Sequence, residues 1–221
     1  MHNSPKYSCD GKGLTLWLVA IAALIGGVLA ANQLLQPPAA PVLSQSTTRL
    51  VPARVLQAFE LIDHTGAAFN LERLRGHWSF LFFGYTHCPD ICPTTLNTLN
   101  VLARTIATLP EPASTPQYLF VSVDPERDTP ELLAKFVPYF NPTFIGVTGT
   151  TSAIDMLTKQ LSIMHMKIES DRPDNYLVDH SAALLLIDPQ GNLHALMSPP
   201  FDTDRMTQDF QKLTAYYEAI Q

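Results

Sequence analysis

The sequence has little cysteine, little charge and no internal repetition, and each shortage excludes a class of protein. Three cysteines in 221 residues are too few for a domain held together by disulfide bonds. Charged residues make up 15% and the formal net charge is −6, which excludes a general nucleic-acid-binding protein. Solenoids and propellers are excluded because no long repeat is visible. With 46% apolar residues, the chain has enough apolar side chains for a folded core.

An uncharged, apolar stretch runs from Leu14 to Ala31. At a rise of about 1.5 Å per residue it would be roughly 27 Å long, close to the thickness of a bilayer's hydrocarbon core. Lys6 and Lys12 precede it, and the next basic residue is Arg49. The positive-inside rule then predicts a transmembrane anchor over residues 14–35, with the N-terminus in the cytoplasm and the rest of the chain outside it.

Two other interpretations of this stretch stay open, a cleaved signal peptide and a buried soluble helix. Val28-Leu29-Ala30 loosely resembles a cleavage site for the first of these. Cys9 precedes the stretch and is interpreted as incidental. No Arg-rich amphipathic presequence comes before it, which favours a bacterial inner membrane with a periplasmic C-terminal domain over a mitochondrial location.

Composition divides the chain into four predicted parts. Residues 36–54 are rich in proline and alanine, and such a segment favours an extended linker. The complete division is a cytoplasmic N-terminus at 1–13, the anchor at 14–35, the linker at 36–54 and a folded domain at 55–221.

Apolar runs and helical periodicities alternate through the predicted folded domain. Short continuous apolar runs predict buried strands, and apolar residues spaced by three and four predict helices. The predicted strands are 59–62, 79–84, 118–123, 144–147, 164–168 and a hairpin of 183–187 with 193–197, and the predicted helices are 91–109, 129–139, 151–161 and 203–220. This order indicates an α/β fold with a central mixed sheet flanked by helices, and a thioredoxin-like fold fits it.

The densest group of reactive residues directly follows the strand predicted at 79–84. Cys88 and Cys92 lie in the segment Gly84-Tyr85-Thr86-His87-Cys88-Pro89-Asp90-Ile91-Cys92-Pro93, which opens the next predicted helix. The backbone N–H groups and dipole at a helix start favour thiolates, so we expect lowered thiol pKa values here. Residues four apart share one helix face, so both sulfur atoms can reach one point.

Two thiols at this spacing suit a structural disulfide, a redox-active dithiol or a soft-metal site. A disulfide here would close a very short loop and stabilise the fold little. Thioredoxin-type redox pairs usually have two intervening residues rather than three. Thiolates select Cu(I) and imidazole also suits copper, whereas zinc usually takes four protein ligands, or three and a water. The pattern therefore favours copper, with a histidine as third ligand.

His180 is the strongest of the candidate histidines. It directly precedes a predicted buried strand, and the corresponding loop of a thioredoxin-like sheet packs against the start of the active-site helix. His87, beside Cys88, is a second candidate, as a ligand or as a residue behind the ligands.

The other histidines are weaker candidates. His165 lies between Met164 and Met166, whose thioethers could bind Cu(I), but alternating methionines on a strand are more typical of core packing. We interpret His194 as structural. His64 and His77 are expected at the surface, and His2 on the cytoplasmic side.

Three segments in this order resemble the Sco/SenC family of copper chaperones for cytochrome c oxidase assembly. They are Phe83-Gly84-Tyr85-Thr86-His87-Cys88-Pro89-Asp90-Ile91-Cys92-Pro93-Thr94, Ser122-Val123-Asp124-Pro125-Glu126-Arg127-Asp128-Thr129-Pro130 and Asp179-His180-Ser181. The resemblance extends from about Val55 to the C-terminus and implies a thioredoxin-like fold. It also implies one copper ion, as Cu(I) or Cu(II), held by Cys88, Cys92 and His180.

The same resemblance implies a partner and a function. The partner is cytochrome c oxidase subunit II, whose dinuclear CuA centre receives the copper, and some members are also proposed to reduce the cysteines of that centre. Other periplasmic copper carriers or thiol reductants are further candidate partners. Whether the chain is an enzyme stays open, although a metallochaperone is favoured.

Asp124 ends a predicted buried strand, where its carboxylate can lie behind the metal ligands and tune them. The alternative is that it simply begins a turn. Arg127 and Asp128 are expected to form a local ion pair that fixes the same loop, without a catalytic role.

Three functional hypotheses follow. The first is a copper chaperone that passes its metal on by ligand exchange. The second is a thiol–disulfide oxidoreductase with Cys88 and Cys92 as its redox pair, for which His180 is dispensable. The third is a thioredoxin-superfamily peroxidase, and the arrangement of threonine and arginine that it needs is not found.

Overall fold

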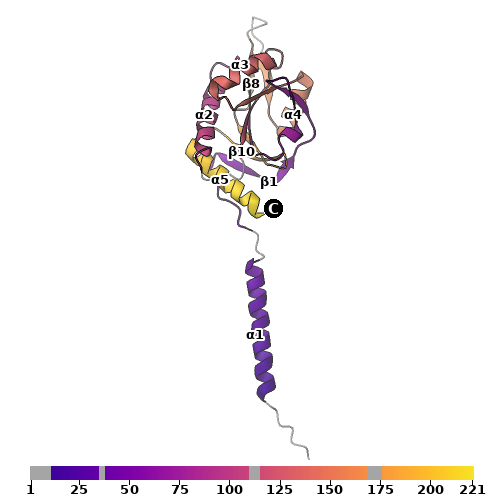
Figure 1. Cartoon of the computed structure of the whole chain (residues 1–221), viewed down its shortest axis with the longest axis vertical. Coiled ribbons are helices and arrows are strands. Elements are labelled where there is room, and N and C mark those ends of the chain that lie inside the picture. Colours follow the sequence, from indigo (N-terminus) through magenta and orange to yellow (C-terminus); the bar gives the residue numbers. More distant parts are fainter. Residues whose placement is uncertain (1–10, 35–37, 110–114, 169–175) are drawn as a thin grey trace, which may run out of the picture. The chain divides into compact units, whose positions relative to one another are not determined.

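The computed structural model describes residues 11–34, 38–109, 115–168 and 176–221. The chain divides into two compact units, Pro41–Ala215 and a second composed of Met1–Ala40 with Tyr216–Gln221. The helices are α1 (Gly11–Leu34), α2 (Ile91–Ile106), α3 (Pro130–Phe140), α4 (Thr151–Leu161), α5 (Thr203–Ala219) and a 3-10 turn at Leu71–Arg73. The strands are β1 (Thr47–Val55), β2 (Glu60–Asp63), β3 (Ala68–Asn70), β4 (Ser79–Gly84), β5 (Gln117–Ser122), β6 (Ile145–Thr148), β7 (His165–Ile168), β8 (Leu177–His180), β9 (Leu184–Ile187) and β10 (Asn192–Met197) (Figure 1).

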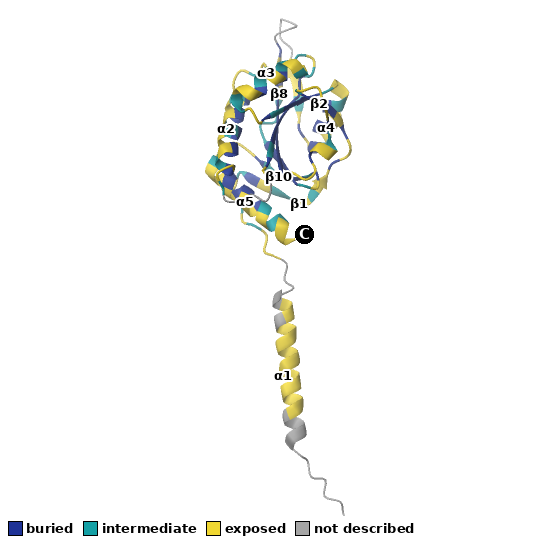
Figure 2. Cartoon of the chain, viewed as in Figure 1, coloured by how far each residue is buried: buried dark blue, intermediate teal, exposed yellow. Residues whose placement is uncertain are grey.

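The segment predicted as a membrane anchor forms α1, and the large apolar side chains described on it are exposed (Figure 2). Among the described residues, no helix combines the length and the apolarity that crossing a membrane requires. The predicted transmembrane helix is therefore not supported. Lys6, which entered the topology prediction, lies outside the described residues, and so do His2 and Cys9.

The larger unit is built on an eight-stranded mixed sheet with the order β1-β10-β9-β4-β5-β6-β2-β3. Near its middle, β4 pairs in parallel with β5 and antiparallel with β9, and β5 pairs in parallel with β6. Helices α2 and α4 lie on opposite sides of these strands (Figure 1). The predicted α/β class, with a mixed sheet flanked by helices, is confirmed.

The central strand and the helix after it follow directly from the sequence pattern. All six residues of β4 are buried, as expected for an apolar run covered on both faces. Leu96, Leu99 and Leu102 form the buried stripe of α2. At the start of α3, the Thr129 side chain accepts a hydrogen bond from the Leu132 N–H, as predicted for a helix N-cap. These elements place the end of β4 directly before the cysteine segment.

Other features also differ from the sequence-based expectations, among them β3, which was not predicted. The predicted linker at 36–54 contains most of β1, which pairs antiparallel with β10. The sequence did not predict this strand because its buried and exposed residues do not alternate regularly and Pro52 lies within it. Its extended conformation depends instead on pairing with β10. His180 does not lie in a loop but ends β8, which pairs with β7 in a separate two-stranded ribbon.

Candidate metal centre

The two cysteines lie where the chain leaves β4 and enters α2. Cys88 lies in the loop, where its N–H donates to the Tyr85 carbonyl, and Cys92 lies in the first turn of the helix. The Cys92 N–H donates to the Cys88 sulfur over 3.4 Å. The expectation that both cysteines lie on one helix face is therefore wrong, and the turn before α2 brings the sulfur atoms together instead. Cys92 is fully buried, whereas Cys88 is partly exposed.

Gly84, the last residue of β4, makes room for the buried cysteine. A Cβ atom at this position would lie 2.7 Å from Cys92 Sγ and 2.8 Å from the Phe120 ring. Neither distance is compatible with an ordinary packed side chain, so position 84 needs glycine for reasons of space. Sequence analysis did not assign this role to Gly84, although a glycine that ends an apolar strand beside two cysteines was a usable signal.

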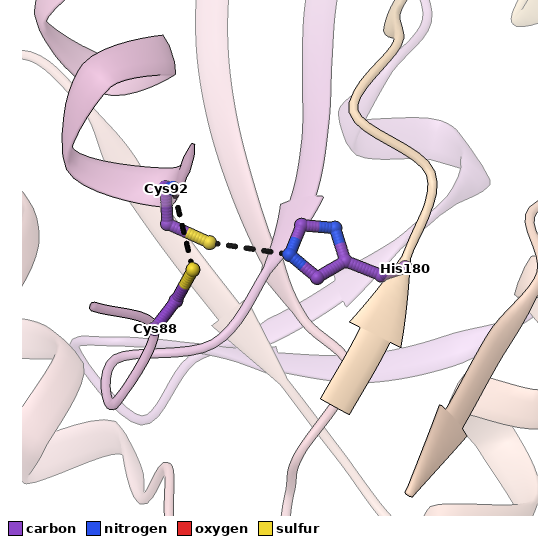
Figure 3. A group of neighbouring side chains, drawn as sticks. All are labelled: Cys88, Cys92 and His180. Atoms are coloured by element: carbon purple, nitrogen blue, oxygen red, sulfur yellow. Dashed lines mark hydrogen bonds between the residues drawn. The ribbon is translucent and has the colours of Figure 1, made fainter. Parts of the chain in front are cut away.

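The histidine reaches the cysteines from the ribbon. At the end of β8, His180 directs its Nε2 toward Cys92 Sγ at 3.3 Å (Figure 3). Its Nδ1 lies 3.1 Å from the Ser181 carbonyl oxygen, which can only accept a hydrogen bond. Nδ1 therefore carries the proton, and the lone pair of Nε2 faces the sulfur atoms. The rings of Phe82 and Tyr85 contact the imidazole edge-on, each with its centroid 5.9 Å away.

The donor atoms of Cys88, Cys92 and His180 all lie within 4.8 Å of one another. Burial lowers the pKa of His180, which keeps the imidazole neutral and able to bind a metal. Burial strongly raises the pKa of Cys92, so the expected lowering by the helix start is wrong for this residue. The Cys92 thiol is therefore protonated at neutral pH, and a metal ion that bound its sulfur would have to displace this proton.

A polar cluster ties β5 to the ribbon behind the histidine. Asp124 accepts hydrogen bonds from the Arg127 guanidinium and from the Tyr176 hydroxyl, the latter over 2.6 Å. The guanidinium also lies over the Tyr176 ring at 3.6 Å and donates to the Tyr176 carbonyl. Tyr176 directly precedes β8, so this cluster fixes the start of the strand that ends in His180. Asp124 thus contacts Arg127 and Tyr176, and through Tyr176 it lies next to the start of the strand that carries His180.

Asp128 fixes the cysteine loop instead of pairing with its neighbour. Its fully buried carboxylate accepts hydrogen bonds from the N–H and hydroxyl of Thr86 and from the hydroxyl of Ser122. The predicted Arg127–Asp128 ion pair is therefore wrong, since Arg127 pairs with Asp124. Burial raises the pKa of Asp128, although these three hydrogen bonds oppose the rise.

The remaining candidates lie around this centre. His87 contacts the Thr86 hydroxyl, and its half-exposed ring lies outside the three-donor cluster. His165 lies opposite His180 in the ribbon and contacts the Thr158 hydroxyl and the Asp155 carboxylate. The core-packing interpretation of Met164 and Met166 is wrong, because these side chains are 82% and 64% exposed.

The donor set fits copper by its chemistry. Two thiol sulfurs and one neutral imidazole nitrogen are soft to borderline ligands, and the cluster contains no carboxylate of the kind that magnesium or calcium would need. Three protein ligands are one fewer than a structural zinc site normally has. A thioredoxin-like mixed sheet that carries these donors at the start of a helix defines a protein that handles a soft metal or exchanges thiols.

Comparison with known proteins identifies the family. The SCO1/SenC family model matches residues 47–215, so the chain belongs to the SCO1/SenC family. A SCO2-like protein of Rickettsia prowazekii is 37% identical over 187 residues, which cover 81% of this chain and 87% of that protein.

Two solved structures are also similar. The copper-bound structure of Arabidopsis thaliana ScoI is 35% identical with a TM-score of 0.68, and the match covers 73% of this chain and 98% of that one. The copper-bound structure of Bradyrhizobium japonicum ScoI is 31% identical with a TM-score of 0.61, and here the match covers 72% and 98%.

Proposed function

We propose that this chain binds one copper ion through Cys88, Cys92 and His180 and delivers it to the CuA centre of cytochrome c oxidase subunit II. The observation that carries the proposal is the convergence of two sulfur atoms and one imidazole nitrogen within 4.8 Å. Copper bound in the similar ScoI structures supports the choice of metal. The acceptor is the one that the family resemblance implies.

The unequal burial of the ligands suits transfer by ligand exchange. Cys92 is fully buried, while Cys88 and His180 are partly exposed. Three ligands leave copper with room for a further donor, so an acceptor thiolate can approach from the side of Cys88. The Cys88–copper bond then breaks as the acceptor bond forms, and the copper keeps its oxidation state throughout. Cys92 is the ligand expected to release the metal last.

The test is anaerobic Cu(I) binding by the full-length chain. A fragment that begins at Arg54 would lose most of β1, which starts at Thr47. We expect one Cu(I) per reduced chain, and we expect His180→Ala to weaken it by at least about 100-fold, because a ligand is lost rather than a residue behind one. Zn(II) serves as the control metal and should bind more weakly.

Transfer needs a separate measurement. The copper-loaded chain is mixed with a copper-free CuA domain of subunit II, and the two proteins are separated and analysed for metal. Movement of copper to the acceptor supports delivery. Copper that stays on the chain under these conditions contradicts it.

A thiol–disulfide oxidoreductase is the second candidate, because both cysteines are free and their sulfur atoms are close. The partly exposed Cys88 would attack the target disulfide and the buried Cys92 would resolve the mixed disulfide, with two electrons passing to the target. In this case His180→Ala leaves the dithiol–disulfide potential and the reduction of an oxidised CuA domain unchanged. A reversible disulfide without tight copper binding would favour this candidate over the chaperone.

We also propose that the larger unit works outside the bacterial cytoplasm, in the periplasm. The support is the lysines at positions 6 and 12, which precede the uncharged stretch Leu14–Ala31. Fusion of alkaline phosphatase to the C-terminus tests this, because that enzyme is active only after export. An inactive fusion beside an active cytoplasmic reporter would contradict the proposal.

A further inference from the structure

Two exposed methionines lie beside the candidate centre and have no part in the function proposed above. Met164 and Met166 are 82% and 64% exposed, although burying such a side chain would be worth about 1.5–3 kcal/mol. Both lie at the ribbon formed by β7 and β8. Packing therefore does not explain why two thioethers occur here.

Both methionines line a cavity that also reaches the histidine of the candidate centre. This cavity has a volume of about 760 Å³ and lies between α4 and the ribbon, with His180 in its wall. Its lining includes Asp155 and Asp179 but only one basic residue, Lys159. The charge around it is therefore net negative, which favours a cation over an anion.

The spacing of the methionines lets them share one ion. Alternate residues in an extended chain point to the same side and are about 6.6 Å apart. Methionine has a long, unbranched and flexible side chain, so both sulfur atoms can turn toward one point. His165, between them, also lines the cavity, where its imidazole contacts the Thr158 hydroxyl and the Asp155 carboxylate. Within the part of the chain that the structure describes, the two thioethers are the only sulfur donors that line this cavity.

We propose that Met164 and Met166 form a second binding site for a soft monovalent metal ion, which is Cu(I) under physiological conditions. Neutral thioethers select Cu(I) over harder cations and hold it more weakly than thiolates do. Binding at this site depends only on the two sulfur atoms. Its use in loading the Cys88–Cys92–His180 centre rests on the function proposed above.

The loading step is an exchange of ligands without a redox change. The two thioether–copper bonds break, and two thiolate–copper bonds and one imidazole–copper bond form. The protons of the thiols pass to solvent, and copper remains Cu(I). The shared cavity wall keeps the two sites adjacent, so an ion held at the methionines starts its transfer next to His180.

The test uses a Cys88→Ser/Cys92→Ser double variant of the full-length chain, which lacks the stronger site. Ag(I), an air-stable substitute for Cu(I), is titrated while the ε-methyl signals of ¹³C-labelled methionine are followed by NMR. We expect the signals of Met164 and Met166 to shift together and to saturate at one equivalent. The signals of the buried Met197 and Met206 provide internal references.

The matched control is Met156→Leu, because Met156 is also exposed, at 56%, but does not line the cavity. A Met164→Leu/Met166→Leu pair of substitutions should weaken Ag(I) binding at least roughly tenfold, and Met156→Leu should leave it unchanged. Equal shifts of all exposed methionines, or no shift of either cavity methionine, would overturn the proposal. Should the double serine variant not fold, a second equivalent of Ag(I) added to the intact chain gives the same readout.

Two further results separate this proposal from the function proposed above. A chain whose cysteines bind no copper, but whose two methionines still bind Ag(I), retains the second site and loses the chaperone function. A chain that loads its cysteine centre at the same rate with and without Met164 and Met166 overturns the use of this site in loading.

Discussion

The cysteine side and the histidine side of the centre are built in different ways. The cysteines follow β4, whose six residues are all buried and which is paired on both edges within the large sheet. His180 ends a four-residue strand of a separate ribbon, in which Met166, Ile168 and Leu177 are exposed. One half of the site therefore belongs to the core of the larger unit, and the other half is attached to it mainly through side chains.

This difference bears on how the site can hold and release a metal. Few buried apolar contacts and many exposed groups are the marks of a region that opens at low cost in free energy. The cysteine pair is therefore expected to keep its geometry without metal, whereas the histidine depends on Arg127 and Tyr176 to keep its place. We infer that the histidine side is the adjustable half of the centre and the cysteine side the rigid half, and changes to each half test that inference.

Gly84→Ala should have the largest effect on stability and on copper affinity, because it changes the packing around Cys92 on the cysteine side of the centre. The new Cβ would meet Cys92 Sγ at 2.7 Å and the Phe120 ring at 2.8 Å. We expect the free energy of unfolding to fall by about 1–3 kcal/mol, as for other overpacked core positions. Displacement of a ligand should also lower Cu(I) affinity by at least about 100-fold, measured by competition with a chromophoric chelator.

The matched control is Gly27→Ala, because a Cβ at this glycine meets nothing within 4 Å. It should change neither the stability of the larger unit nor its copper affinity. Normal copper affinity in Gly84→Ala would mean that the cysteine half adapts more easily than its packing indicates.

Arg127→Met tests the attachment of the histidine half. It removes the cation over the Tyr176 ring and leaves the buried Asp124 carboxylate with the Tyr176 hydroxyl as its remaining side-chain donor. We expect a loss of roughly 1–3 kcal/mol in stability and a 10- to 100-fold loss of copper affinity. Thermal unfolding and chelator competition measure the two effects.

Tyr176→Phe disturbs the same contacts less than Arg127→Met does. It keeps the ring beneath Arg127 and removes the hydroxyl that bonds to Asp124, so we expect a loss of about 1 kcal/mol in stability. Equal effects of the two substitutions on copper affinity would show that the hydroxyl, rather than the cation, holds the ribbon.

The sequence was informative about the ligands and much less so about what supports them. Cys88, Cys92 and His180 could be predicted as ligands because thiols and imidazoles are the side chains that bind soft metals. The spacing of the two cysteines identified the first pair, and the position of His180 before a predicted strand favoured it over the other histidines. The need for glycine at position 84 could not be predicted, since it depends on how closely Cys92 Sγ and the Phe120 ring approach this residue in the folded chain. The predicted ion pair of Arg127 with Asp128 was wrong because the Asp128 side chain points into the core, where it accepts hydrogen bonds from Thr86 and Ser122.

The ribbon illustrates the same limit for the fold. β7 and β8 are four residues each, and their pairing brings His165 opposite His180. Strands this short have little periodicity, so the sequence predicted an extended piece near Met164 and a loop at His180. The exposure of Met164 and Met166 followed from this pairing and from the absence of a covering layer among the described residues.

Copper affinity should rise with pH because the buried thiol must lose its proton. Burial raises the pKa of Cys92, so this thiol is protonated throughout the neutral range, and metal binding releases the proton. Between about pH 6.5 and 8.5 we expect an increase in Cu(I) affinity of roughly tenfold per pH unit from this thiol. The lowered pKa of His180 means that its imidazole does not add to the slope in this range.

Chelator competition at several pH values measures this slope, and Cys92→Ser is the control because it removes the proton concerned. An affinity that does not change with pH in the unaltered chain would mean that Cys92 is already a thiolate before copper binds. The cysteine side would then have both the geometry and the charge of the copper-bound state before the metal arrives.

His87→Ala should have the smallest effect, although sequence analysis placed His87 among the candidate residues behind the ligands. Its ring is half exposed, it contacts the Thr86 hydroxyl, which also donates to Asp128, and its Nδ1 lies 4.0 Å from the Asp128 carboxylate. Because the hydrogen bonds between Thr86 and Asp128 remain, the cysteine loop should keep its position, and copper affinity should change by less than about threefold. Chelator competition measures this, with His180→Ala as the contrasting variant. A loss of copper affinity comparable to that of His180→Ala would indicate that His87 is a ligand. The cysteine side and the histidine side of the centre would then each supply one imidazole.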